Sequence, residues 1–138
     1  MAFDLERFVA AQEDVYQGAL RELRWGRKTG HWIWFIFPQL VGLGRSETSR
    51  FYGIASVEEA RAYLAHPVLG PRLRESVSAV LATSGARAGQ IFGSLDAMKV
   101  RSSLTLFHRA APDEPLFRQM LERFYSGVTD DATDALLR

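Results

Sequence analysis

The clearest pattern of hydrophobic and polar positions lies in residues 4–25, where apolar side chains recur at three- and four-residue intervals. At about 100° per residue, this spacing places them on one face of a helix and the charged residues on the other. Asp4 is placed to cap the start of this helix and Gly26 to end it. One polar residue, Gln12, interrupts the centre of the apolar face. The apolar face consists of Leu5, Phe8, Val9, Val15, Tyr16, Ala19, Leu20 and Leu23.

A second pattern follows His31, where every residue from Trp32 to Phe37 is apolar and Pro38 ends the run. A run of this length fits a buried strand or a buried helix, and its periodicity does not distinguish the two. It is much too short to cross a bilayer. We expect Trp32–Phe37 to pack in the core in either conformation.

Capping residues and prolines indicate the elements in the rest of the chain. Six or seven helices without a convincing pair of strands predict an all-α fold, a single multihelical domain over residues 1–138 built around the buried aromatic segment. The predicted elements are a turn capped by Ser46, a helix over 56–65 with a Ser56–Glu59 capping box, helices beginning at Pro71 and Pro115, a loop over 84–89, a helix over 95–109 capped by Ser94, and a last short helix capped by Thr129 or Asp131.

Composition narrows the function mainly by exclusion. The 17 basic and 16 acidic residues leave a net charge of +1, which gives no electrostatic footprint for a membrane and makes nucleic-acid binding an unfavoured prediction. The chain has no cysteine, which excludes disulfides, thiolate nucleophiles and cysteine-based zinc sites. Residues 1–7 carry charges and lack the apolar stretch of a signal peptide, so we expect a cytoplasmic protein.

The helix predicted over 95–109 carries three polar residues inside its apolar arc. Measured from its first residue, Lys99 falls at about 40°, Ser103 at about 80° and Asp96 at about 100°. An ideal helix therefore turns all three towards the core. Because unpaired buried charges are costly, they must be paired with one another or face a ligand. The apolar residues of the arc are Leu95, Val100, Leu106 and Phe107.

Two interpretations of this triplet remain open. In the first, Asp96 and Lys99 form an ion pair and Ser103 returns its hydroxyl to the helix backbone. In the second, the helix is the wall of a pocket in which Lys99 meets an anion and Asp96 acts as a base or orients the ligand.

Other candidate residues flank the aromatic segment. His31 could serve as a general base, because an unperturbed imidazole titrates near neutrality, but it would equally suit a capping or core position. Arg27 and Lys28, which precede it, would form either an anion-binding rim or a solvated turn. Gln12 and Gln39 could recognise a ligand through their amides, or tie helix ends and loop backbone together.

Four motifs together span nearly the whole chain, and they are Asp4-Leu5-x-Arg7-Phe8-x-x-Ala11-Gln12, Gly26-Arg27-Lys28-x-x-His31-Trp32-x-Trp34-Phe35-Ile36-Phe37-Pro38-Gln39, Glu59-Ala60-x-Ala62-Tyr63-Leu64-x-His66-Pro67-Val68-Leu69-Gly70-x-Arg72-Leu73, and Ile91-Phe92-Gly93-x-x-Asp96-x-x-Lys99-x-x-Ser102-Ser103-x-Thr105-Leu106-Phe107. On these motifs, in this order, the chain resembles the bacterial domain-of-unknown-function family 1810. Ile33 and Leu104 stand where that pattern leads us to expect methionine. The resemblance implies a multihelical fold with a buried central helix and no established activity or catalytic residues.

The label calpastatin, which members of that family often carry, finds no support in this sequence. A calpastatin resembles a disordered inhibitor, whereas 47% of these residues are hydrophobic and 12% are aromatic.

The remaining signatures are absent from the sequence. No pair of histidines or carboxylates has metal-ligand spacing, and there is no Gly-x-Ser-x-Gly elbow or P-loop, so we expect neither a metal nor a cofactor. We predict that the protein binds a small anionic, phosphate- or nucleotide-like ligand between the His31 segment and residues 96–103. If it also catalyses a reaction, which stays open, His31 or Asp96 would be the acid or base and Lys99 would stabilise charge. The alternative is a structural or interaction protein in which these polar residues form a buried core network.

Overall fold

The computed structural model describes residues 3–138, so Met1 and Ala2, part of the stretch used to predict the location, lie outside the described residues. The described chain is all-α, as the sequence predicts. No helix in this part of the chain has the length and apolar character needed to span a membrane. The helices are α1 (Glu6–Gln12), α2 (Tyr16–Trp25), α3 (Ile33–Ile36), α4 (Glu47–Phe51), α5 (Val57–Ala65), α6 (Leu69–Leu81), α7 (Ala88–Phe92), α8 (Ser94–Ala110), α9 (Pro115–Tyr125) and α10 (Asp131–Leu137).

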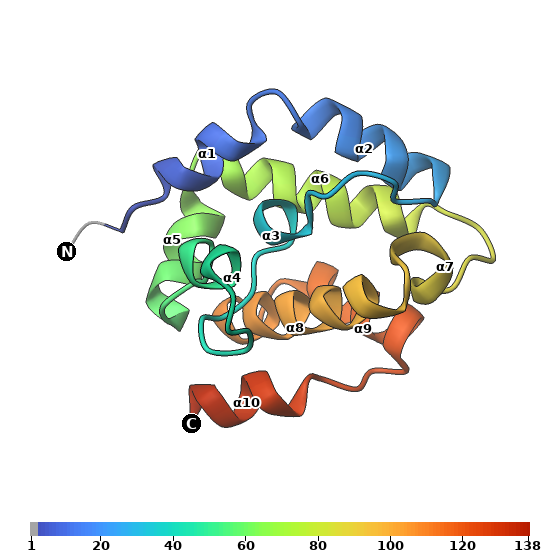
Figure 1. Ribbon diagram of the computed structural model, residues 1–138. Coiled ribbons are helices and arrows are strands. Elements are labelled where there is room, and N and C mark those ends of the chain that lie inside the picture. Colours follow the sequence, from blue (N-terminus) through green and yellow to red (C-terminus); the bar gives the residue numbers. More distant parts are fainter. Residues whose placement is uncertain (1–2) are drawn as a thin grey trace.

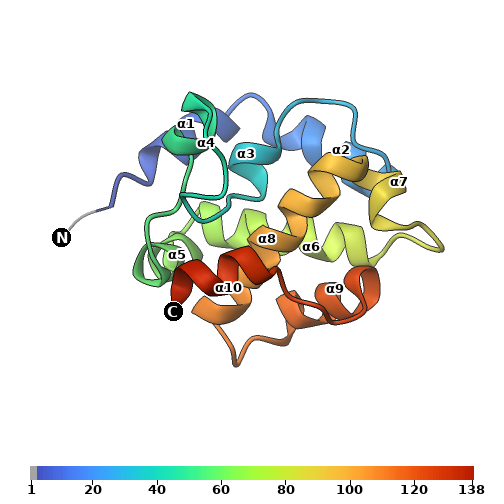
Figure 2. The same cartoon turned by 60° about the horizontal axis from the view of Figure 1, so that its bottom comes forward.

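The longest helix, α8, organises the fold, because α3, α5, α7, α9 and α10 all pack against it. Figure 1 shows α3 lying between α8 and the pair formed by α1 and α2, while α10 follows α8 on the side away from that pair. The second view, in Figure 2, shows α10 lying across α8 near the C-terminus. Every helix that meets α8 therefore covers a different part of its surface.

The aromatic segment forms a buried central helix, which resolves the ambiguity left by its periodicity. Ile33 and Ile36 of α3 are buried, as are the flanking Trp32 and Phe37. The Phe37 ring meets Phe92 edge-on, with 5.7 Å between the ring centres. After α3 the backbone is extended, but between residues 3 and 138 it pairs only through one parallel bridge, from Leu40 to Ile54. Without a neighbouring strand, a helix satisfies the backbone of this segment internally.

The predicted helix over 4–25 is wrong as a continuous element, since residues 13–15 interrupt it between α1 and α2. The Gln12 side chain reaches across to the Phe35 carbonyl and the Tyr63 hydroxyl, so the chain turns where this residue bonds to other elements. Asp4 does not cap α1, whose N-cap is Leu5 without a side-chain hydrogen bond. Gly26 ends α2 as predicted, with φ of 75° in the left-handed region.

Helix boundaries in the middle of the chain are partly confirmed. Ser46 and Ser56 cap α4 and α5 as predicted. The helix assigned to Pro71 begins at Leu69 instead. There His66 accepts hydrogen bonds at Nδ1 from the Val68 and Leu69 backbone, and so caps the following helix.

Three local predictions, near α7, α8 and α10, are wrong. Part of the loop expected over 84–89 belongs to α7, a five-residue helix. Gly93 rather than Ser94 is the N-cap of α8, with φ of 81°, and this left-handed residue sets the turn between α7 and α8. The cap of α10 is Asp130, which lies between the two predicted residues and accepts a hydrogen bond from the Thr133 backbone. Pro115 begins α9 as predicted.

Candidate functional site

Two lysines share one carboxylate where the turn after α2 meets the first turn of α8. The Lys28 Nζ lies 2.7 Å from Asp96 Oδ2, and the Lys99 Nζ lies 3.2 Å from Asp96 Oδ1. Each ammonium also lies over an indole ring, Lys28 over Trp32 at 5.1 Å and Lys99 over Trp34 at 4.3 Å. The cluster is largely buried and opens to solvent mainly at Lys99, because the exposed fractions are 6% for the Lys28 side chain, 19% for Asp96 and 22% for Lys99.

The turn over residues 26–30 holds Lys28 in this position. Its backbone N–H donates to the Ile91 carbonyl at 2.6 Å, which ties the turn to α7, and its ammonium donates to the Gly30 carbonyl at 2.6 Å. The Glu22 carboxylate accepts from the backbone N–H groups of Thr29 and Gly30 at 2.6 Å and 2.8 Å. Lys28 is therefore fixed from both ends of the turn, whereas Lys99 extends from one helix.

The electrostatics of the cluster keep Asp96 ionised. Burial raises the pKa of this carboxyl, but the hydrogen bonds and charges of Lys28 and Lys99 outweigh burial and hold the pKa below its ordinary value. The position in the first turn of α8 also favours a negative charge. A carboxylate in this state is a weak base at neutral pH.

A pocket of about 270 Å³ opens beside Lys99. The segment that includes α3 contributes Trp34 and Gln39, and α8 contributes Lys99 together with Ser102. Asp130 also lines the pocket, and its Oδ2 accepts a hydrogen bond from the Ser102 hydroxyl at 3.0 Å. The pocket is completed by Leu43, Gly44, Leu95, Met98 and Ala132.

The structure brings some of the predicted site residues together at this pocket and leaves others away from it. Lys99 and Gln39 line the pocket, and Asp96 and Lys28 stand behind Lys99. The pocket lining does not include His31, which is exposed. Arg27 is also exposed, and it lines a different pocket, along α2. Ser103 is buried, and its hydroxyl has no hydrogen-bond partner in the described chain.

Gln12 lies in a separate polar network among α1, α3, α5 and α6. Its amide nitrogen donates to the Phe35 carbonyl at 2.7 Å and to the Tyr63 hydroxyl at 3.1 Å. Its amide oxygen accepts from Arg72 at 3.4 Å. With 1% of the residue exposed, Gln12 is closed to solvent, and it lines none of the pockets described here.

Comparison with known proteins supports the resemblance carried by the four motifs. The family model described as "Protein of unknown function (DUF1810)" matches residues 2–137. The chain belongs to the DUF1810 family. Among solved structures, this DUF1810 protein is similar to the conserved hypothetical protein Rv1873 from Mycobacterium tuberculosis, with 51% sequence identity and a TM-score of 0.96. The similarity covers 98% of this chain and 96% of that one, and no curated protein matches.

Sequence reasoning missed the other aromatic and polar residues that line the pocket of this DUF1810 protein, which are Trp34, Ser102 and Asp130. The sequence favoured core packing for Trp34, although its ring is half-buried and lines the pocket with Lys99. The helical arc pointed to Ser103, whereas its neighbour Ser102 lines the pocket. Asp130 reaches Ser102 only because α10 packs against α8. The arrangement offers no metal site, since no three histidine, aspartate or glutamate side chains between residues 3 and 138 gather to hold an ion.

Proposed function

We propose that this DUF1810 protein binds a small phosphate- or nucleotide-like anion, with an apolar or aromatic body, in the pocket beside Trp34 and Lys99. The observation that carries the proposal is the position of the Lys99 ammonium. It lies at the pocket wall, 4.3 Å from the centre of the Trp34 ring, and the carboxylate behind it is already bound by Lys28. An anion in the pocket would meet the Lys99 ammonium, which shares its carboxylate partner, Asp96, with Lys28.

The charges around the pocket support an anionic rather than a cationic ligand. Three cations, Lys28, Lys99 and Arg101, stand against two carboxylates, Asp96 and Asp130, which leaves one positive charge in excess. Asp130 offers little to a cationic ligand, because one of its oxygens already accepts from Ser102 and Thr133. The surplus therefore belongs to Lys99, the more exposed lysine of the Asp96 cluster.

The size and walls of the pocket limit what it would hold. About 270 Å³ lies just below the roughly 300–1,000 Å³ typical of small-molecule sites. Trp34 and Met98 offer apolar surface to a ring or short chain, while the Gln39 amide offers both a donor and an acceptor. These features suit a mononucleotide or a smaller phosphate ester.

Binding is favoured over catalysis at this pocket. The lowered pKa of Asp96 makes this carboxylate a weak general base, and His31 lies away from the pocket lining. The remaining pocket groups can position and neutralise an anion, but none of them is an activated nucleophile. We therefore assign the geometry to recognition and leave a reaction out of the proposal.

Calorimetric titration with adenosine monophosphate, phenyl phosphate and uncharged adenosine tests this function. We expect both phosphates to bind and adenosine to bind at least about tenfold more weakly, because a charge-assisted contact contributes about 1.5–3 kcal/mol. Lys99→Met should weaken phosphate binding by a similar factor while preserving the aliphatic stem over Trp34. Trp34→Leu should weaken the binding of phenyl phosphate, because it removes the aromatic wall of the pocket.

Arg118→Met provides a matched control, because it removes one positive charge from an exposed position on α9 outside the pocket. Its affinities should equal those of the wild type. Equal binding of the phosphates to the wild type and Lys99→Met, or no binding of either phosphate to the wild type, would refute the proposal.

A further inference from the structure

The exposed face of α2 carries a feature that the pocket beside Lys99 does not use. Trp25 is 87% exposed, more than any other large hydrophobic side chain among residues 3–138. It stands at the last position of α2, about 180° around the helix from the buried Tyr16. In the isolated chain this indole is exposed to water and gains no free energy from burial. Exposure of a large aromatic side chain is typical of a residue that anchors a partner.

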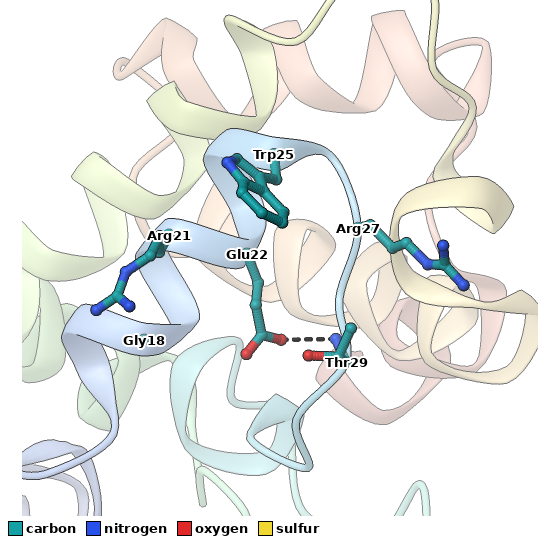
Figure 3. Close-up of a pocket in the computed structure, with 6 residues that line it drawn as sticks. All are labelled: Gly18, Arg21, Glu22, Trp25, Arg27 and Thr29. Atoms are coloured by element: carbon teal, nitrogen blue, oxygen red, sulfur yellow. Dashed lines mark hydrogen bonds between the residues drawn. The ribbon is translucent and has the colours of Figure 1, made fainter.

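Trp25 forms one end of a groove of about 480 Å³ along this face. Gly18, Arg21 and Glu22 precede it at helical spacing, so the groove follows one stripe of α2 for about 10 Å. The turn after the helix adds Arg27 and Thr29 as the other wall, as Figure 3 shows. We define these six residues as the Trp25 groove.

The floor of the Trp25 groove is open at Gly18. A Cβ atom added there would meet nothing within 4 Å, so no neighbouring element of the described chain requires a glycine. Glycine is nevertheless a poor helix former. The missing side chain leaves room for the backbone of another molecule to approach α2 closely.

The charges that the Trp25 groove presents to solvent are positive. Arg21 and Arg27 lie on opposite sides of the strip formed by Trp25 and Glu22 (Figure 3). Neither arginine is part of an ion pair within residues 3–138. The Glu22 carboxylate is turned inward, where it accepts hydrogen bonds from the backbone of Thr29 and Gly30 and from Trp32 Nε1. Two guanidinium groups therefore face solvent on either side of an indole.

We propose that the Trp25 groove binds an acidic segment of a partner protein, with an aromatic or aliphatic side chain seated on Trp25 and carboxylates on Arg21 and Arg27. Guanidinium groups match carboxylates in a bidentate geometry, and tryptophan and arginine are the residues that most often dominate protein interfaces. A nucleic acid fits less well, because its backbone needs a continuous row of cations. The cations of α2 do not form such a row, because the acidic residues Glu13 and Asp14 are exposed just before the helix and Arg24 lies 3.8 Å from Glu75.

Selection of a random peptide library on immobilised wild-type protein tests the proposal. We expect enrichment of peptides in which acidic residues flank an aromatic or aliphatic one. An enriched peptide, labelled with fluorescein, should lose at least about tenfold in affinity for Trp25→Ala and for Arg21→Gln/Arg27→Gln in anisotropy titrations. Gly18→Leu should fill the floor and weaken binding similarly, without lowering the melting temperature.

Phe51→Ala removes a different exposed aromatic side chain and should leave peptide affinity unchanged. Enriched peptides without acidic residues, or peptides that bind Trp25→Ala as tightly as the wild type, would overturn the proposal. Tighter binding of a single-stranded oligothymidylate than of any selected peptide, lost in Trp25→Ala, would overturn it in favour of nucleic acid. The Lys99→Met variant should bind the peptides normally, so this test and the phosphate titration fail independently.

Discussion

Two polar clusters interrupt apolar helix faces in this protein, and they have opposite outcomes. In the Gln12 network, the amide has a partner for both its nitrogen and its oxygen, and the residue is buried. In the Asp96 cluster, two lysines share one carboxylate, and the more exposed lysine stands at the wall of a pocket. The first cluster is closed by its own contacts, whereas the second keeps a cation that a further group could bind.

The difference shows what a polar residue on an apolar face does and does not predict. In both cases the pattern predicts burial or partial burial, because the residue lies among core-facing neighbours. A structural role and a binding role differ in the number of partners, and those partners come from other elements. The number of hydrogen-bond partners that each polar group has in the folded chain therefore distinguishes two clusters that have similar sequence patterns.

Replacement of Gln12 should have the largest effect on stability. Gln12→Leu leaves the Phe35 carbonyl and the Tyr63 hydroxyl without their partner in a buried site, so we expect a loss of about 3 kcal/mol in the free energy of unfolding. Urea denaturation measures this loss, and Gln17→Leu, at an exposed position on α2, is the control. Phosphate affinity should be unchanged. A loss no larger than that of Gln17→Leu would mean that the network is not closed.

Replacement of Lys28 should rank second. Lys28→Met keeps an apolar stem against Trp32 but removes the 2.7 Å ion pair with Asp96 and the bond to the Gly30 carbonyl. Because the pair is only partly buried, we expect a loss of about 2 kcal/mol. The neighbouring Arg27→Met removes an exposed charge and should cost much less in the same denaturation experiment. Equal losses in the two variants would place Lys28 with the solvated residues of the turn.

The titration of Asp96 gives a smaller, pH-dependent effect. Its pKa is lowered in the folded protein, so its charge adds stability above the ordinary carboxyl pKa and that contribution disappears as pH falls through the lowered value. Asp96→Asn should cost about 1–2 kcal/mol near pH 7 and progressively less below about pH 4. The cost of Gln12→Leu should persist over the same range, because an amide does not titrate there. A pH-independent cost of Asp96→Asn would contradict the electrostatic account.

The sequence predicted much of the fold because its signals were local. Ser46, Ser56 and Pro115 fixed helix starts through bonds or ring geometry within a few residues. The break at residues 13–15 and the cap at Asp130 were missed, because Gln12 bonds to Tyr63 and Asp130 packs beside Ser102, contacts distant in sequence. The pairing of Lys28 with Asp96 likewise depends on how the turn meets α8.

The candidate site was likewise predictable where its residues are close in sequence and not where they are distant. Helical spacing placed Asp96 and Lys99 together, since both belong to one helix. Two adjacent residues of the basic turn belong to different sites, because Lys28 pairs with Asp96 and Arg27 lines the Trp25 groove. No sequence spacing distinguishes these two residues. Trp25 offered a signal that was overlooked, because its position opposite the apolar face of α2 already predicts an exposed ring.

Lys99→Met should have the smallest effect on stability and the largest on anion binding. Asp96 keeps its shorter contact to Lys28, and the methionine preserves apolar contact with Trp34, so the free energy of unfolding should fall by less than about 1 kcal/mol. The affinity for phenyl phosphate should fall at least about tenfold, because no other cation lines the pocket in the described chain. Denaturation and calorimetric titration on the same samples provide both values. If instead stability falls as far as in Lys28→Met and affinity does not change, Lys99 belongs to a closed network like that of Gln12, and the contrast between the two clusters disappears.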